Sequence, residues 1–263
     1  KHIDRFMDMA KEADEVIICD TGSTDNTVSR FKELGATVYS IEVNPWRFDV
    51  ARNVALSKCP KDADVYVSVD IDEIFTSGWR KEIENLWDKD TKAMAYFYVF
   101  NWEDDEQTIP KITMWSSKIH NKEWIWKYPI HEVLEYTGVP GTEKIVISEN
   151  FKLFHYPDLN KSRSSYLPLL EESTKNEPDN IRMSMLLGRE YMFYNKFDLA
   201  IKELKRFLHI SDNDETSDTL QLRSIACRYI ARCYWALAKE SNNKNADNIL
   251  RWILRSDGEW PFC

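Results

Sequence analysis

Glu15-Val-Ile-Ile-Cys-Asp-Thr-Gly-Ser-Thr-Asp25 is the stretch that decides the fold. Its short apolar run ends at Asp20 and has the length and composition of a buried strand. The turn-forming residues that follow interrupt the run, and Ser23, Thr24 or Asp25 can cap a helix after it. A strand, a tight turn and a helix in this order predict the start of an alternating α/β domain.

The same alternation continues along the next 45 residues. Residues 37–43 and 64–69 read as strands, and residues 49–57 between them read as a helix. Strands that alternate with helices favour a mostly parallel sheet covered on both faces. Ligands of such sheets bind at the carboxyl ends of the strands. Two of these predicted strands end in aspartate, at Asp20 and Asp70, so we expect the site there.

The second half of the chain changes character. Residues 93–146 carry β-rich segments with interleaved aromatic residues, and strand signals stop after Pro157. Residues 160–175 and 181–256 show the spacing of helices. We therefore predict an α/β domain over residues 1–160 and an all-α helical-repeat domain over residues 161–263.

Composition narrows the classes of function. With 43% hydrophobic and 30% charged residues, the 263-residue chain is typical of globular proteins, and its formal charge of −9 argues against nucleic acid as a partner. No apolar run approaches the roughly 20 residues that span a bilayer. The five cysteines form no Cys-x-x-Cys pair, which favours neither disulfides nor zinc. We expect a cytoplasmic protein without a transmembrane segment.

The strongest chemical signal is Val69-Asp-Ile-Asp-Glu73. Paired carboxylates are the oxygen ligands that Mg²⁺ and Mn²⁺ prefer when these ions also bind substrate phosphates. An isolated Asp-x-Asp is more often a solvated acidic turn, so its meaning depends on the motifs around it.

Two neighbouring motifs favour a metal site at Asp70-Ile-Asp72 over a solvated acidic turn. Asp20-Thr-Gly-Ser-Thr-Asp-Asn-Thr27, Ala51-Arg-Asn53 and Asp70-Ile-Asp72, taken in this order, resemble the donor site of family 2 glycosyltransferases. The resemblance implies a GT-A fold and inverting transfer of a sugar from a nucleotide-sugar, with UDP the expected nucleotide. It implies that Asp20, Arg52 and Asp70 bind the donor and that Asp72 holds Mn²⁺ or Mg²⁺.

The resemblance continues beyond the donor half. Trp126-Lys-Tyr-Pro-Ile-His-Glu132 and Phe154-His-Tyr156 are similar to segments of one subgroup of the family. This implies that Glu132 is the catalytic base and that His155 is a metal ligand; the alternatives are a surface charge and a hydrogen-bonded structural histidine. Asp104 and Asp105 are rival bases. The aromatic residues that could form an acceptor platform, or simply fill the core, are Trp115, Trp124, Trp126 and Tyr128.

The helical half resembles the tetratricopeptide-like helices of the same subgroup, through Leu187-Gly-Arg-Glu-Tyr191 and Lys196-Phe-Asp-Leu-Ala-Ile201. Two helical hairpins bury less surface than the three or more repeats that such arrays need. We therefore expect this half to dock on the α/β domain or to self-associate. Family members also carry an apolar strand before the position where Lys1 stands, so either the sequence is a fragment or the sheet lacks its first strand.

The sequence thus predicts a metal-dependent, hexosyltransferase-like enzyme whose acceptor is a saccharide, a lipid or a peptide. One alternative is a non-catalytic helical-repeat interaction protein with a degenerate nucleotide-sugar-binding domain. A nucleotidyltransferase is a weaker alternative, because the sequence has no Gly- and Lys-rich phosphate loop.

Overall fold

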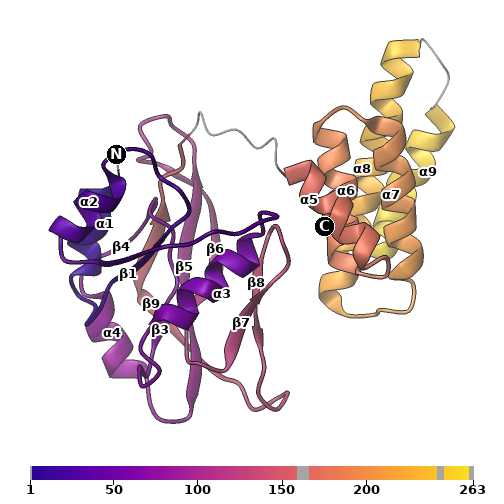
Figure 1. Cartoon of the computed structure of the whole chain (residues 1–263). Coiled ribbons are helices and arrows are strands. Elements are labelled where there is room, and N and C mark those ends of the chain that lie inside the picture. Colours follow the sequence, from indigo (N-terminus) through magenta and orange to yellow (C-terminus); the bar gives the residue numbers. More distant parts are fainter. Residues whose placement is uncertain (1, 159–165, 242–245, 261–263) are drawn as a thin grey trace. The chain divides into compact units, whose positions relative to one another are not determined.

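A computed structural model describes residues 2–158, 166–241 and 246–260 of the chain. The chain divides into two compact units, Lys1–Lys161 and Ser162–Cys263, which we call the α/β unit and the helical unit (Figure 1). Part of the helix expected over residues 160–175 lies outside the described residues. No helix of the described part is long and apolar enough to cross a membrane.

The first part of the α/β unit follows the predicted alternation. Its elements are α1 (Ile3–Ala10), β1 (Ile17–Asp20), α2 (Thr27–Glu33), β2 (Thr37–Ser40), α3 (Phe48–Lys58) and β3 (Tyr66–Val67). Strands β1 and β2 pair in parallel. The strand expected over residues 64–69 is shorter than predicted, because only Tyr66 and Val67 pair with a neighbouring strand.

The second part builds most of the sheet. Its elements are β4 (Glu73–Phe75), α4 (Trp79–Leu86), β5 (Thr91–Trp102), β6 (Pro110–His120), β7 (Trp124–Lys127), β8 (Val133–Tyr136) and β9 (Lys144–His155). The five-stranded sheet has the order β3-β6-β5-β9-β4, and β7 and β8 form a separate hairpin. Only the β5–β9 pair of the five-stranded sheet is parallel.

The prediction of a mostly parallel sheet is therefore wrong for the described strands, which form a mixed sheet. The reason lies in the connection between the two long strands. The amide of Glu103 donates to the carbonyl of Ile109 across 2.9 Å, which closes a short turn between β5 and β6. A turn this short joins only antiparallel strands, whereas β9 returns parallel to β5 after a longer connection through β7 and β8.

One face of the sheet carries the core of the α/β unit. Helices α1, α2 and α4 contribute large apolar side chains to it, and β4, β5, β6 and β9 contribute the facing ones. The central residues of this core are Phe6, Phe31, Trp79, Ile83, Phe75, Met94, Tyr96, Ile119 and Leu153. Helix α3 instead contacts β1 and β7. The core thus fixes β4, β5 and β9 together, and their ends carry the polar side chains described below.

The helical unit contains five helices among its described residues. They are α5 (Tyr166–Asn176), α6 (Ile181–Phe193), α7 (Phe197–Ile210), α8 (Ser217–Ser241) and α9 (Ala246–Glu259). Each helix packs against the next one along the chain, as Figure 1 shows. The side chain of Asn180 caps α6 by accepting from the amide of Met183. Consecutive packing is compatible with a helical repeat, but it does not by itself confirm a tetratricopeptide-like one.

Close packing of α6 on α7 depends on a glycine. A methyl group built on Gly188 would lie 2.6 Å from Cγ of Leu204, which is fully buried. The two helices approach more closely here than any larger residue would allow. The core of the unit continues through Ala200, Phe207, Ala226 and Ile230.

Candidate active site

The Asp-x-Asp motif forms a tight turn at the start of β4. The amide of Glu73 donates to the carbonyl of Asp70, and the amide of Asp70 donates to Oε2 of Glu73, both across 2.9 Å. The Glu73 side chain is only 1% exposed. A buried carboxylate therefore fixes the backbone of this turn and presents the side chains of Asp70 and Asp72 at the end of the sheet.

Two further groups hold Glu73 in place. Its Oε1 accepts from the hydroxyl of Tyr98 at 2.6 Å and from the ammonium of Lys118 at 2.5 Å. Burial, followed by the charge of Glu73, raises the pKa of Tyr98, so this hydroxyl stays a donor. Sequence reasoning missed Glu73, Tyr98 and Lys118. The sequence adjacency of Glu73 to Asp72 was the only available signal.

Arg52 of α3 joins two carboxylates. Its Nε donates to Oε1 of Glu132 at 2.7 Å, and its second terminal nitrogen lies 2.9 Å from Asp70. The guanidinium also lies 4.6 Å from the ring centroid of Trp126. Burial disfavours its charge, but Asp70 and Glu132 outweigh burial and raise the pKa of Arg52. The resemblance predicts that Arg52 binds the donor, and this role stays a prediction; in this structure its guanidinium pairs with two carboxylates.

The opposite charges also act on Asp70. Partial desolvation would raise the pKa of this carboxyl, but Arg52 and then Lys118 outweigh it and lower the pKa to about 2. The Asp70 side chain remains 45% exposed. It is therefore ionised at neutral pH and still accessible to a ligand.

The segment that leads to Glu132 has a strained backbone. Tyr128 and His131 both have positive φ angles, 79° and 52°, which L-residues adopt rarely. The amide of Phe48 donates to the carbonyl of Pro129 within this segment. Asn53, next to Arg52, exchanges two hydrogen bonds with the backbone of Trp126. Together these contacts fix the segment against α3 and bring Glu132 to Arg52. Strained backbone held in this way is typical of functional sites.

Asp72 and His155 lie next to each other. Nε2 of His155 is 3.6 Å from Oδ2 of Asp72, and Nδ1 of His155 is 3.1 Å from the carbonyl of Phe100. Burial would raise the pKa of Asp72, but the hydrogen bond and charge of His155 lower it overall. Burial would lower the pKa of His155, but the contact with Asp72 raises it overall. The backbone contributes as well, since the amide of Tyr156 donates to the carbonyl of Asp72.

Asp20 is separate from this cluster in its contacts. Its carboxylate accepts from the amides of Gly22 and Ser23 at 3.1 Å each and so closes the turn after β1. The hydrogen bond with Ser23, the largest influence, outweighs burial and lowers the pKa of Asp20. Among the described residues, no contact joins Asp20 to Arg52, Asp70 or Asp72.

The rival bases have other roles or no defined one. Asp104 accepts from Thr108 and from the amide of Ile109 at 2.7 Å, which makes it part of the β5–β6 turn. Asp105 is exposed. Of the candidate platform, Trp126 is buried under Arg52 and Trp124 packs on Tyr136. Trp115 is 47% exposed and stacks on Phe97 at 4.1 Å.

Comparison with known families decides the class of protein. Residues 2–143, more than half of the chain, match the family model for glycosyl transferase family 2. The chain belongs to glycosyl transferase family 2. No curated protein matches it. Membership establishes a glycosyltransferase with a GT-A α/β fold, which acts on a nucleotide-sugar donor and an acceptor. The matched range includes Asp20, Arg52, Asp70, Asp72 and Glu132, but it ends before His155.

The cluster offers two side chains that suit a divalent ion. No group of three or more His, Cys, Asp or Glu side chains in the described ranges could hold a metal ion. Asp72 and His155 supply two possible ligands, a carboxylate oxygen and an imidazole nitrogen. Mg²⁺ and Mn²⁺ sites that also bind substrate phosphates often use only one or two protein ligands, so the pair fits such an ion.

Proposed function

We propose that this family member transfers a hexose from a UDP-sugar with inversion and depends on Mn²⁺ or Mg²⁺. The observation that carries the proposal is the contact between Asp72 and His155, from distant parts of the sequence, directly beside the Arg52–Asp70 ion pair. Carboxylates and an imidazole gathered at one end of the sheet suit a metal-diphosphate better than they suit a neutral ligand.

In this proposal Asp72 and His155 hold the ion. When bound, it would neutralise charge that develops on the leaving diphosphate. Phosphate oxygens and water would complete its ligand set.

Arg52 and Asp70 orient the donor. Asp70 is ionised and exposed enough to accept a hydrogen bond from a ribose hydroxyl. Arg52 fixes the direction of that carboxylate through a charged hydrogen bond. Asp20 would bind the uracil or the ribose, and the amides of the turn after β1 hold its carboxylate.

Glu132 acts as the base. Its Oε1 is fixed by Arg52, which leaves Oε2 to take the proton of the acceptor nucleophile. The nucleophile's freed electron pair forms the bond to the anomeric carbon. On the opposite face of the sugar, the bond to the diphosphate oxygen breaks and its electron pair leaves with UDP. The Glu132 side chain is 13% exposed, so the proton transfer takes place in a site that is shielded from bulk water.

Release of UDP from UDP-glucose, UDP-galactose and UDP-N-acetylglucosamine tests the proposal. With Mn²⁺ we expect release from at least one donor, and we expect loss of release in excess chelator and in Asp72→Ala. Asp8→Asn is the matched control, because Asp8 is exposed and pairs only with Lys11 in the described structure. Undiminished release in chelator would exclude the metal-dependent mechanism.

A further inference from the structure

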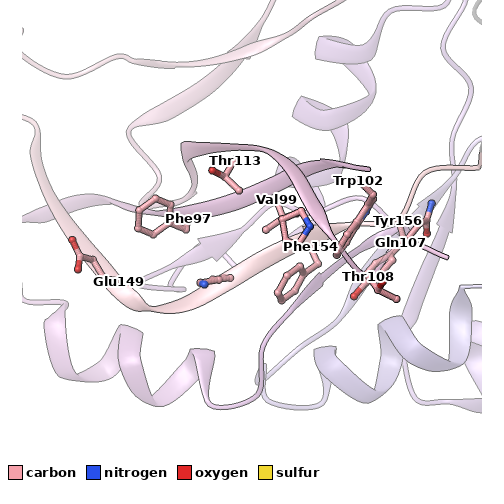
Figure 2. Close-up of a pocket in the computed structure, with 11 residues that line it drawn as sticks. Phe97, Val99, Trp102, Gln107, Thr108, Thr113, Glu149, Phe154 and Tyr156 are labelled. Atoms are coloured by element: carbon pink, nitrogen blue, oxygen red, sulfur yellow. The ribbon is translucent and has the colours of Figure 1, made fainter. Parts of the chain in front are cut away.

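A cavity of about 740 Å³ lies on the face of the sheet opposite the core. Its walls come from β5, β6 and β9 and from the turn after β5, as Figure 2 shows. The register places Phe97 opposite Lys152 and Val99 opposite Phe154, while Tyr98, between them in sequence, opposes the core residue Leu153. Successive strand residues point to opposite faces, so this cavity and the core lie on different sides of the same strands.

Aromatic rings dominate the walls. Trp102 stacks on Phe154 at 5.8 Å and on Tyr156 at 5.2 Å. Phe97 extends the apolar surface at the other end, backed by the exposed Trp115. The C–H faces of a sugar ring carry partial positive charge, and aromatic faces carry partial negative charge, so flat aromatic surfaces suit sugar rings.

The polar groups of the cavity match a neutral ligand. The lining has one acidic and one basic side chain, Glu149 and Lys152, so its formal charges cancel. Neutral donors and acceptors come from Gln107, Thr108 and Thr113. This set offers hydrogen bonds to hydroxyls but no pair of metal ligands such as Asp72 and His155, which sets the cavity apart from the proposed donor site. The guanidinium of Arg5 lies over one ring of the lining, 3.7 Å from the ring centroid of Tyr156.

The cavity and the donor-site residue His155 lie on opposite faces of β9, at the same end of that strand. Phe154 and Tyr156 flank His155, and Nε1 of Trp102 donates to the carbonyl of His155 at 2.6 Å. A chain of sugars could therefore occupy the cavity and continue past the ends of β5 and β9 towards Asp72. Binding of such remote units supplies energy that orients the reacting unit.

We propose that this cavity binds a neutral oligosaccharide as a remote acceptor subsite. The acceptor role rests on the proposed glycosyl transfer, whereas the binding of saccharide does not. The volume of the cavity lies within the range of roughly 300–1,000 Å³ that small-molecule sites occupy.

Saturation-transfer NMR on the full chain tests the subsite. The probes are malto-, cello-, chito- and mannotetraose, each without donor. We expect at least one to bind, and we expect Thr113→Trp to weaken that binding at least about tenfold, since an indole would fill the cavity. Met114→Trp is the matched control, because exposed Met114 pairs with Tyr98 and lies on the other face of β6.

Two results would overturn the subsite. The first is no saturation transfer from the wild-type chain to any of the four tetraoses, as would follow if a second copy of the chain covered the cavity. The second is equal binding in Thr113→Trp and in the wild type. Titration of the same samples with UDP and Mn²⁺ separates the proposals: bound UDP without bound tetraose rejects the subsite alone, and bound tetraose without bound UDP rejects the donor site alone.

Discussion

The carboxylate cluster of the α/β unit and the α6–α7 contact of the helical unit are built on opposite principles. The cluster gathers charges around Glu73, which is almost fully buried, and carries residues with positive φ at Tyr128 and His131. The helical contact has no charge at its centre, where Gly188 meets Leu204. Buried charges are costly unless each has its partner, whereas apolar contacts stabilise directly. The difference indicates that the first region is shaped for chemistry and the second for stability.

The largest effect should fall on the chemical step of transfer. In Glu132→Gln the side chain keeps its shape but can no longer take a proton. We expect transfer to fall about 100- to 10,000-fold, while the affinity for UDP with Mn²⁺ stays nearly unchanged. Single-turnover kinetics and calorimetry on the same sample measure both quantities. Normal transfer in Glu132→Gln, with loss in Asp104→Asn or Asp105→Asn, would move the base to the β5–β6 turn.

Glu73→Ala should break the cluster itself. It leaves the Lys118 ammonium and the Asp70 amide without their partner, so we expect the free energy of unfolding to fall by about 3 kcal/mol. Urea denaturation measures this change. The double variant Glu73→Leu, Lys118→Met should recover much of the loss, because both charges are then removed together. A single variant as stable as the wild type would show that the buried pair does not support the turn.

Gly188→Ala tests the close packing of α6 on α7 in the helical unit. The added methyl group must displace Leu204, so we expect a loss of about 1–3 kcal/mol in the stability of the helical unit. UDP affinity should not change. Thermal unfolding followed by circular dichroism, with UDP titration beside it, gives both results. An unchanged melting temperature would mean that α6 and α7 do not pack this closely.

The smallest expected effect is a gain at a second helical glycine. A methyl group on Gly258 of α9 meets nothing within 4 Å. Gly258→Ala should therefore stabilise the unit by about 0.5–1 kcal/mol through helix propensity alone. The same thermal measurement tests it, and a destabilisation comparable to that of Gly188→Ala would contradict the distinction between the two positions.

The sequence predicted those features that are encoded locally. The apolar run before Asp20 and the helix around Arg52 are set by neighbouring residues, and β1 and α3 confirm them. Family membership, predicted from three short motifs, is confirmed by the match over residues 2–143. The sequence reveals these motifs because each one consists of residues that are close together along the chain.

The remaining features depend on pairings between distant residues. Arg52 and Glu132 are 80 positions apart, and the spacing of neither motif indicates that they form an ion pair. Lys118 reads as one of several polar residues in its strand, yet it neutralises Glu73. The direction in which β9 pairs with β5 is likewise decided by the connection between them and by core packing. Local propensity therefore predicted strands there but not the mixed sheet.

Calorimetric titration of the full chain with UDP, with Mn²⁺ and then in excess chelator, tests the central claim most directly. If Asp72 and His155 hold the ion that binds the diphosphate, UDP should bind in Mn²⁺ and lose at least about tenfold in affinity in chelator, or about 1.4 kcal/mol. Asp72→Ala should show the weak affinity under both conditions. Equal affinity for UDP with and without the metal, in the wild type and in Asp72→Ala, would contradict the account.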